Sequence, residues 1–583
     1  MTQADPSAAA SASNTASPSA SKTAPLYEAL ARAVIAEGVT TQFVLMGDGN
    51  MHFSTAFDGL AETQSIAVRH EHCAVAAATA YHVATGGIAL ASVTCGPGLT
   101  QITTALPAAV RARIPVVIFA GETPINARFY NQAIEQAPFI TACGAPYIQA
   151  HAMSRVFDRV REAFHIARTQ RTPVVLAIPY DMQKQAVDTA EPYVPSERLY
   201  PDGGRPHADP ERIAVLVERL AQAKCPVILG GRGVLRAQAQ TDVVALADRV
   251  GALLANTLPV RGLFDHHPYG LGVMGGYSAE LTREIMAEAD LVVAIGAGLS
   301  YYTVDGGKLF PNAHIIQIDE APSGLRDGMR AADLYITADA QAASKQALAA
   351  FNARYGAQGG AASSLRTPAL ARRIAQQVAD SATFDIPAGV VDPRAVIQAL
   401  DHVIPKDWDI ISGSGHQAYF NSQMRGRPGD RFVTIREFGA IGNGLSYALG
   451  VAAARRQGAQ GRIVLIEGDG GLLMHIQELE TLKRQGLRVL LCCLNDGAYG
   501  SEIHKLRAEG LDDSGAVFGR PPLDAVARGF GLRGAVIKDV SDIAERFAAF
   551  EAQDQAELWN IHISDDVTAP TMRSIIKRGH GVM

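Results

Sequence analysis

Residues 464–500, VLIEGDGGLLMHIQELETLKRQGLRVLLCCLNDGAYG, decide the fold of this chain. The apolar run 463–466 predicts a buried strand, which a glycine-rich turn follows. Leucine and isoleucine then recur on one face of 472–482, which predicts an amphipathic helix. A second apolar run, 489–494, predicts the next strand. The stretch therefore predicts a strand–helix–strand unit of a parallel sheet.

Two aspartates stand directly after the two predicted strands. Asp469 lies in the glycine turn 468–471, and Asp496 follows the second strand. The carboxyl ends of parallel strands meet at one edge of a sheet, where open α/β sheets bind ligands. Hard oxygen ligands beside a helix N-terminus favour a Mg²⁺ ion that also holds phosphate oxygens. The alternative is an ordinary crossover with a polar turn.

The composition of the 583 residues limits the classes of protein that remain. Hydrophobic residues are 48% and charged residues 19%, so about three domains with large cores are possible. A net charge of −6 with scattered lysine and arginine argues against a nucleic-acid partner. The six cysteines lack CxxC spacing, which indicates buried thiols in a reducing compartment, the cytoplasm. Apolar runs stay below ~18 residues, so we expect no membrane span.

Helical and strand patterns alternate along the chain from residue 25. This alternation predicts the α/β class, with three doubly wound parallel-sheet domains. The first 24 residues are mostly Ala, Ser, Thr and Pro and lack the features of a secretory signal. The predicted divisions are a disordered tail at 1–24, a first domain at 25–185, a linker at 186–208, a second domain at 209–350, a linker at 351–390 and a third domain at 391–583.

Several motifs, in order, resemble those of thiamine diphosphate (ThDP) enzymes of the acetolactate synthase-like and 2-oxo acid decarboxylase superfamily. Gly468-Asp469-Gly470 with the later pair Asn495-Asp496 is similar to the family's diphosphate motif. The resemblance implies Mg²⁺ bound by Asp469, Asp496 and the main-chain carbonyl of Ala498. The family often has Asn where this chain has Asp496, and the extra negative charge still favours Mg²⁺.

The segment 70–81, with the pattern HExxAxxxAxxY, is similar to the one that carries the family's activating glutamate. The resemblance implies that Glu71 hydrogen-bonds the pyrimidine ring of ThDP and stabilises the tautomer that activates the thiazolium carbon. Such an acid should lie in an apolar site that raises its pKa. From the residues alone, Glu71 is also explained as a carboxylate favoured by a helix N-terminus.

Other turns of the first domain also resemble family motifs. Residues 94–98, TCGPG, are similar to a TSGPG turn that approaches the pyrimidine, and 46–51 are similar to the AGDYN turn of pyruvate-type decarboxylases. The latter places Asp48 at a proton-relay position, although an ordinary turn-forming aspartate looks the same. The candidates of this domain, besides Glu71, are Gly47, Asp48, Pro97, Gly98, Gln101 and Gln136, the last near an active-site glutamine of acetolactate synthases or an ordinary loop residue.

Two loops of the third domain resemble cofactor contacts of the family. Residues 413–417, GSGHQ, match its GxHQ element, and 438–445, FGAIGNGL, match a run whose bulky residue, here Ile441, holds ThDP bent. His416 is also a catalytic candidate. The implied cofactor contacts in this domain are Gly413, Gly415, His416, Gln417, Gly439, Ile441, Gly468, Asp469, Gly470, Gly471, Asp496, Ala498 and Tyr499.

The second domain offers a weaker signal. Glycines at 230, 231 and 233 follow a predicted strand and invite a dinucleotide-binding interpretation, but a lone glycine turn is weak support. In the resembled family this domain binds FAD in acetolactate synthases, and ADP or nothing elsewhere. The run that contacts FAD there is replaced here by 300–304, SYYTV, which disfavours FAD and favours a structural domain.

The resemblance implies a ThDP- and Mg²⁺-dependent enzyme that decarboxylates a 2-oxo acid and transfers the acyl carbanion to an aldehyde or ketone acceptor. A non-ligating decarboxylase, a 2-hydroxy ketone lyase and a non-catalytic ThDP-fold subunit are the alternatives. Retention of Glu71, Asp469 and Asp496 argues against the last. The resemblance also implies a homodimer or homotetramer, because the residue matching Glu71 on one subunit meets the diphosphate domain of another.

Overall fold

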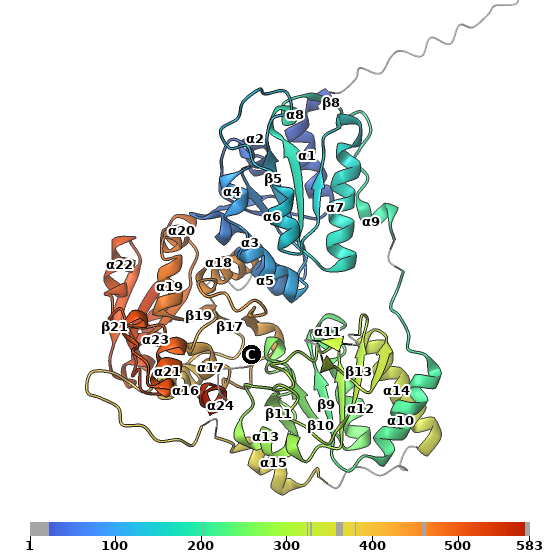
Figure 1. The fold of residues 1–583 in the computed structure, drawn as a ribbon, viewed down its shortest axis with the longest axis vertical. Coiled ribbons are helices and arrows are strands. Elements are labelled where there is room, and N and C mark those ends of the chain that lie inside the picture. Colours follow the sequence, from blue (N-terminus) through green and yellow to red (C-terminus); the bar gives the residue numbers. More distant parts are fainter. Residues whose placement is uncertain are drawn as a thin grey trace, which may run out of the picture.

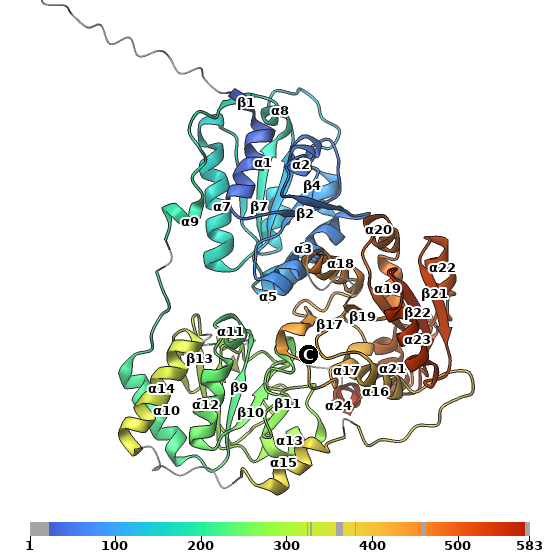
Figure 2. The same cartoon turned by 180° about the vertical axis from the view of Figure 1, so that it is seen from behind.

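The protein has three domains, each built on a six-stranded parallel sheet with helices packed on its faces (Figures 1 and 2). This arrangement confirms the predicted fold class. Most of the predicted tail 1–24 and part of the predicted linker 351–390 lie outside the described residues. The computed structural model describes residues 23–201, 203–322, 325–326, 329–356, 365–378, 380–456 and 462–577, with backbone alone at 325–326 and 329–330.

The first domain has the strand order β3-β2-β4-β5-β7-β6. Its strands are β2 (Thr41–Val44), β3 (Gln64–Ala67), β4 (Leu90–Val93), β5 (Val117–Glu122), β6 (Tyr147–Gln149) and β7 (Val174–Pro179). Its helices are α1 (Leu26–Ala36), α2 (Met51–Asp58), α3 (Glu71–Thr85), α4 (Pro97–Thr100), α5 (Ala105–Ala112), α6 (Ala137–Ala142), α7 (Val156–Gln170) and α8 (Tyr180–Gln183). The stretch predicted as the first linker carries β8 (Ala186–Asp188), paired with β1 (Thr23–Pro25), and α9 (Ser196–Leu199).

The central domain has the order β11-β10-β9-β12-β13-β16, the pattern of a dinucleotide-type α/β fold. Its sheet strands are β9 (Pro226–Gly230), β10 (Leu253–Asn256), β11 (Gly270–Val273), β12 (Leu291–Ile295), β13 (His314–Asp319) and β16 (Leu334–Thr337), and β14 (Leu325–Arg326) pairs separately with β15 (Met329–Arg330). Its helices are α10 (Pro210–Gln222), α11 (Arg232–Arg236), α12 (Gln240–Val250), α13 (Glu280–Ala287), α14 (Ala340–Tyr355) and α15 (Pro368–Ala375), the last inside the stretch predicted as the second linker.

The glycine turn of the central domain has a packing explanation. A Cβ on Gly231 would lie 2.3 Å from the carbonyl oxygen of Gly296, and one on Gly233 would lie 2.5 Å from the Gly296 Cα. The ends of β9 and β12 therefore approach each other so closely that only glycine fits. These glycines do not by themselves point to a bound dinucleotide.

The third domain has the order β18-β17-β19-β20-β22-β21. Its strands are β17 (Asp409–Ser412), β18 (Phe432–Thr434), β19 (Ile463–Gly468), β20 (Leu490–Asn495), β21 (Arg533–Ile537) and β22 (Glu557–His562). Its helices are α16 (Pro393–Val403), α17 (Gln417–Asn421), α18 (Gly444–Arg455), α19 (Asp469–Met474), α20 (Glu478–Gln485), α21 (Gly500–Glu509), α22 (Leu523–Gly529), α23 (Asp542–Glu551) and α24 (Pro570–Lys577).

The single helix predicted over 472–482 is wrong in one respect. Two helices, α19 and α20, cover it, and the chain leaves helical geometry at His475 (φ −133°, ψ 34°). The His475 Nδ1 lies 3.0 Å from the main-chain oxygen of Gly442, a tertiary hydrogen bond that replaces helical continuity. Gly470 and Gly471, predicted as part of a turn, already belong to the first turn of α19.

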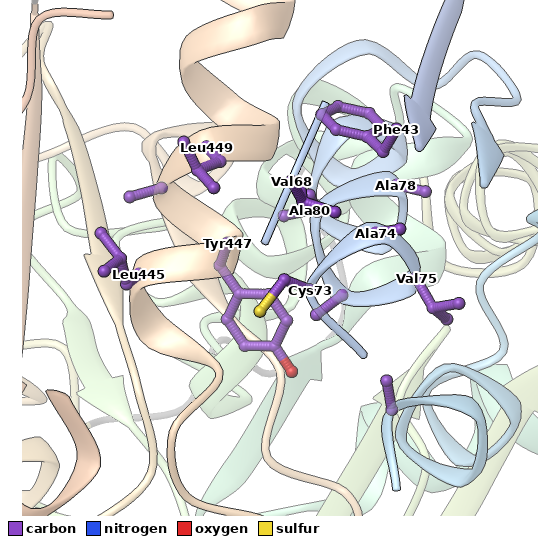
Figure 3. Packing of buried hydrophobic residues seen from close by; sticks show 14 of the residues in the cluster. Phe43, Val68, Cys73, Ala74, Val75, Ala78, Ala80, Leu445, Tyr447 and Leu449 are labelled. Carbon is purple, nitrogen blue, oxygen red and sulfur yellow. The ribbon is translucent and has the colours of Figure 1, made fainter. Parts of the chain in front are cut away.

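The first and third domains repeat one topology, because in each the strands lie in the order second, first, third, fourth, sixth, fifth. Helices α3 and α18 hold equivalent places, each between the second and third strands of its domain. They pack against each other, and Figure 3 shows Cys73 of α3 beside Tyr447 of α18. One continuous hydrophobic core therefore runs through both domains.

Small residues allow the α3–α18 helices to approach backbone to backbone. Alanine fills much of the buried face of α3. On α18, a Cβ on Gly450 would lie only 2.1 Å from the carbonyl oxygen of Ala77. Around this contact, Glu478 is fully buried and accepts a hydrogen bond from the main-chain N–H of Arg69 at 2.8 Å. The two domains are thus joined by close packing and by polar contacts.

The described part of the chain contains no helix of the length and apolar character that a membrane crossing requires. Its six cysteines are free thiols, five of them buried and Cys143 half-buried, as the cysteine spacing predicts.

We expect Gly450→Ala to destabilise the protein by about 1–3 kcal/mol, because the added methyl group must displace the backbone of α3. This loss should appear although alanine favours a helix over glycine by about 1 kcal/mol. Urea or thermal unfolding measures it. Gly515→Ala is the matched control, since no atom lies within 4 Å of its added Cβ; equal stability of the two variants would contradict the packing explanation.

Candidate active site

Asp469 and Asp496 lie side by side at the carboxyl edge of the third sheet, because β19 and β20 are parallel neighbours. Asp469 is the first residue of α19, and Asp496 follows β20 directly. The Asp469 carboxylate accepts hydrogen bonds from the main-chain N–H groups of Gly470 at 2.9 Å and Gly497 at 2.8 Å. Asp496 accepts one from the N–H of Ala498 at 3.2 Å. The predicted juxtaposition of the two aspartates is present.

The electrostatics of this pair fit a divalent cation. Burial raises the pKa of both carboxyl groups, and the charge of Asp469 raises the pKa of Asp496 further. A cation between them would replace this repulsion by attraction. Among the described residues, no three His, Cys, Asp or Glu side chains are arranged to hold a metal, so main-chain and phosphate oxygens must complete the donor set.

Glycines shape the surroundings of the pair into a cradle. A Cβ on Gly500 would lie 2.5 Å from an Asp496 carboxylate oxygen, and one on Gly470 would lie 2.8 Å from the Tyr499 ring. Gly415 (φ 139°) and Gly439 (φ 74°) adopt backbone angles that favour glycine. Helix α19 begins at this cradle, and the N-terminus of a helix favours phosphate oxygens.

A cavity of about 1590 Å³ opens over this cradle, mainly between the third and the central domains, and residues 111–113 and 171 of the first domain also line it. Most of the cofactor candidates of the third domain line it, as the resemblance predicts. They are Gly415, His416, Gln417, Gly439, Ile441, Gly468, Asp469, Gly470, Gly471, Asp496, Ala498 and Tyr499.

Gly413 is the exception among these candidates, since it does not line the cavity. A Cβ on Gly413 would lie 1.9 Å from a carboxyl oxygen of Glu467, so this glycine makes room for a buried acid. Glu467 accepts a hydrogen bond from the Gln417 amide at 2.9 Å, and burial raises its pKa to about 8. A neutral carboxylic acid therefore supports the loop that carries Gln417. Glu467 is not among the residues predicted from the sequence, although a single acid directly after the apolar run 463–466 is a visible signal.

His416 is held in a single protonation state. Burial, with a smaller contribution from His504, lowers its pKa well below the ordinary value, so the imidazole is neutral. Its Nε2 accepts a hydrogen bond from the main-chain N–H of Ala569 at 3.1 Å. The proton of the ring is therefore on Nδ1, which leaves that atom as a donor beside the cradle.

Glu71 is the first residue of α3 and is half-buried. Burial raises the pKa of its carboxyl group, as an acid that must donate a proton requires. A Cβ on Gly98 would lie 3.2 Å from a Glu71 carboxyl oxygen, so the glycine turn after β4 leaves room for this side chain. The role that the family resemblance implies for Glu71 stays a prediction.

The two glycine turns of the first domain pack against each other at the carboxyl edge of its sheet. The Gly49 N–H donates a hydrogen bond to the Thr94 hydroxyl at 2.9 Å, and a Cβ on Gly47 would lie 2.8 Å from the Thr94 Cβ. Gly96 has φ 58°, and Pro97 begins the short helix α4. Gly98 is buried and Gln101 is exposed, so one end of the motif faces inward and the other outward.

Asp48 and Gln136 differ in what they can still bind. Asp48 is exposed, and within the described residues its side chain makes no hydrogen bond. The Gln136 amide is fully occupied, since it accepts from the Gly96 N–H at 2.7 Å and donates to the Gly121 oxygen at 3.1 Å and the Tyr147 hydroxyl at 2.9 Å. Gln136 therefore holds the Gly96 turn in place, while Asp48 is available to a ligand.

The candidate residues of the first domain and those of the third domain do not line one cavity within a single chain. The candidates of the first domain, all of them described, lie outside the cavity that Asp469 and Asp496 line. The start of α3 contacts the far end of α19, where His72 and His475 stack with ring centroids 4.6 Å apart. Asp469 lies at the opposite end of that helix, about 9 Å long at its rise of 1.5 Å per residue. One chain therefore carries two half-sites.

Comparison with known proteins identifies the family. Models of thiamine pyrophosphate enzymes match all three domains, the N-terminal TPP binding domain at 25–139, the central domain at 213–348 and the C-terminal TPP binding domain at 413–560. The chain belongs to the thiamine pyrophosphate enzymes. Thiamine pyrophosphate is another name for ThDP, so the protein is a ThDP-dependent enzyme of the acetolactate synthase-like family that forms or breaks C–C bonds.

Individual relatives and one solved structure show how similar this ThDP enzyme is to known proteins. It is 28% identical over 493 residues to the acetolactate synthase isozyme 2 large subunit of Escherichia coli, covering 80% of this chain and 82% of the relative. It is 26% identical over 506 residues to a probable acetolactate synthase large subunit of Methanocaldococcus jannaschii, covering 81% and 80%. A Mycobacterium smegmatis protein described as a thiamin diphosphate-dependent enzyme shares the fold, with a TM-score of 0.76, 21% identity and coverage of 93% of this chain and all of that chain.

We expect Asp469→Asn and Asp496→Asn to differ although both remove one charge. Asp496→Asn should keep the cation and ThDP, because asparagine retains an oxygen ligand at a position where the family often has it. It should also raise the cofactor-free melting temperature by about 2–4 °C, because the repulsion between buried carboxyl groups is gone.

Asp469→Asn should lose most of the melting-temperature increase that ThDP with Mg²⁺ gives the wild-type ThDP enzyme. Both Asp469 oxygens accept main-chain N–H groups, so the NH₂ group of asparagine would face a donor there and disturb the site. Weaker binding of the ligands gives a smaller increase. Differential scanning fluorimetry with and without both ligands measures the two effects. Identical behaviour of the two variants would refute unequal roles for the two aspartates.

Proposed function

We propose that this ThDP enzyme is Mg²⁺-dependent, decarboxylates a 2-oxo acid and transfers the resulting acyl group to an acceptor carbonyl. The observation that carries the proposal is the buried aspartate pair in its glycine cradle, with a half-buried acid, Glu71, on the equivalent edge of the first domain. The similarity to acetolactate synthase large subunits supports the carboligation step.

The residues of this chain have distinct parts in the proposed reaction. Asp469, Asp496 and the Ala498 carbonyl would hold Mg²⁺, and the N–H groups of the cradle would hold the diphosphate. Glu71 would donate a proton to the pyrimidine ring, and Ile441 would support the bent shape of the cofactor. When bound, ThDP supplies the nucleophilic carbon and the electron sink for decarboxylation.

FAD is left out, because the replaced run 300–304 gives no family-type contact for it. Simple decarboxylation to an aldehyde is the second candidate function, since the exposed side chain of Asp48 is free to relay a proton from water to such a product. Analysis of products from a panel of 2-oxo acids, with and without added aldehyde, separates a coupled hydroxyketone from an aldehyde alone.

We further infer that two copies of the chain complete each active site. Both edges that carry half-sites expose large apolar side chains, as surfaces that bind another protein do. On the first domain, Phe129 is 83%, Met46 55% and Ile125 50% exposed; on the third, Met474 is 49% and Phe518 42% exposed. In a two-fold dimer, the first-domain edge of each copy would pack against the third-domain edge of the other copy. Both apolar surfaces of both copies would then be buried.

Glu71→Gln should lower ThDP- and Mg²⁺-dependent CO₂ release by at least about 100-fold, because the amide cannot donate the proton that a carboxylic acid does. ThDP binding, followed by calorimetry, should change little. Glu62→Gln is the control, an exposed glutamate of the same domain that should leave turnover unchanged. Wild-type turnover in Glu71→Gln would remove Glu71 from the reaction.

Mixing two inactive variants tests the shared site. If Glu71 of one copy acts on the cofactor held by Asp469 of the other, co-refolded or co-expressed Glu71→Gln and Asp469→Asn chains should regain about a quarter of wild-type turnover, because half of randomly formed dimers contain one intact site of two. Sites formed within single chains would give none, since every site would then carry one substitution. CO₂ release against each variant alone measures the difference.

A further inference from the structure

Arg436 lies in the loop between β18 and α18 and lines the wall of the cavity where the central and third domains meet. Its guanidinium carbon lies 5.1 Å from the ring centroid of Tyr277 and 5.4 Å from that of Tyr419. Tyr277 belongs to the central domain and Tyr419 to α17, and the two rings are 5.2 Å apart. Stacking on aromatic faces fixes a guanidinium while its N–H edge stays available for hydrogen bonds.

Arg436 has a charge without a partner. Within the described residues it forms no ion pair, and its Nη1 is buried without a hydrogen-bond partner. The adjacent Glu437 is already used, because one carboxylate oxygen accepts from Arg232 and the other from the main-chain N–H of Arg436 itself. Glu467 accepts from Gln417 with one carboxyl oxygen, and its other oxygen makes no hydrogen bond to Arg436. Arg436 as a whole is half-buried, but its Nη1 is buried. A buried donor without a partner is unfavourable, which indicates that a ligand supplies the acceptor.

Two hydroxyl groups in the same cavity wall also lack hydrogen-bond partners. The Oγ of Ser414 and the Oγ1 of Thr434 are buried without hydrogen-bond partners, and both residues line this cavity. Ser414 precedes Gly415 of the cradle, and Thr434 ends β18 two residues before Arg436. One guanidinium and two hydroxyl donors in one wall form a set that matches an anion with several oxygens.

We propose that Arg436 binds a substrate carboxylate that survives the reaction. This inference rests on the proposed decarboxylation of a 2-oxo acid. A cation on the carboxylate that departs as CO₂ would stabilise the ground state more than the transition state, because that group loses its charge as the bond breaks, and would slow the step. The carboxylate at Arg436 is therefore either that of a 2-oxo acid acceptor or a second carboxylate of a dicarboxylic donor.

The experiment compares Arg436→Met with the wild-type enzyme, both loaded with ThDP and Mg²⁺. The first arm measures coupling to 2-oxobutyrate and to propanal, which has the same carbon skeleton without the carboxylate. The second arm measures CO₂ release from 2-oxoglutarate and from 2-oxopentanoate, which lacks the distal carboxylate. We expect kcat/KM to fall roughly 10- to 100-fold for the carboxylate-bearing member of one pair, with the other member changed less than about threefold. The affected arm identifies the source of the carboxylate.

A binding measurement makes the inference independent of turnover. In the Glu71→Gln background, calorimetric titration of the loaded enzyme with 2-oxobutyrate and with 2-oxoglutarate should show at least about tenfold weaker binding of one of them when Arg436→Met is added. If the wild-type protein turned over no 2-oxo acid while this loss of binding persisted, the proposed function would fail and the assignment of Arg436 would stand.

Three outcomes would overturn the assignment. Arg436→Met could leave both pairs and the titrations unchanged within about threefold. It could weaken ThDP binding instead, which would assign the guanidinium to the diphosphate. Finally, Lys505→Met could give the same selective loss; Lys505 lines the same cavity but pairs with Glu502 at 3.3 Å, so equal losses would indicate general attraction of anions by the cavity.

Discussion

The packing of α3 against α18 is the contact on which the rest of the structure depends. These helices occupy equivalent places in two domains of the same strand order, and they touch backbone to backbone at Ala77 and Gly450. The contact fixes Glu71 at the end of α19 that is farther from Asp469. Within one chain, Glu71 therefore does not line the cavity that contains Asp469 and Asp496. The two-fold pairing proposed above follows from that constraint together with the apolar surface on both edges.

Several buried polar groups in unfavourable surroundings lie at the proposed active site. Asp469 and Asp496 share a buried position without a counter-charge, Arg436 has a buried donor without an acceptor, and Glu467 is kept neutral beneath the loop of Gln417. Each of these arrangements lowers stability when the protein stands alone. Natural proteins accept such local costs at functional sites, and all of these groups lie at one cavity or directly beneath it. The cation and the diphosphate of the cofactor, and the proposed carboxylate, are the charges that would balance them.

Local sequence patterns were sufficient for the elements that lie near one another in the chain. The strands around residues 463–495 and the placement of Asp469 and Asp496 followed from apolar runs and a glycine turn, because parallel strand ends must share an edge. The break at His475 could not be predicted, since the leucine spacing continues through it and a hydrogen bond to the distant Gly442 interrupts the helix. Strand β6 has only three residues, too few for any pattern.

Roles that depend on distant contacts were less predictable. A glycine such as Gly413 looks the same in sequence whether it admits a cofactor or the side chain of Glu467. The amide of Gln136 could have faced a substrate, and only the structure shows it bound to Gly96 and Gly121. The family resemblance supplied Glu71, but the separation of Glu71 from Asp469 within one chain depends on the packing of whole domains.

A crystal structure of the protein with ThDP and Mg²⁺ tests this account most directly. It should show the Glu71 carboxyl group of one copy about 2.6–3.2 Å from the pyrimidine ring of a cofactor whose diphosphate and cation are bound by Asp469 and Asp496 of another copy. A cofactor that contacts Glu71 and Asp469 of the same chain, or that lies away from Glu71 of both copies, would contradict it.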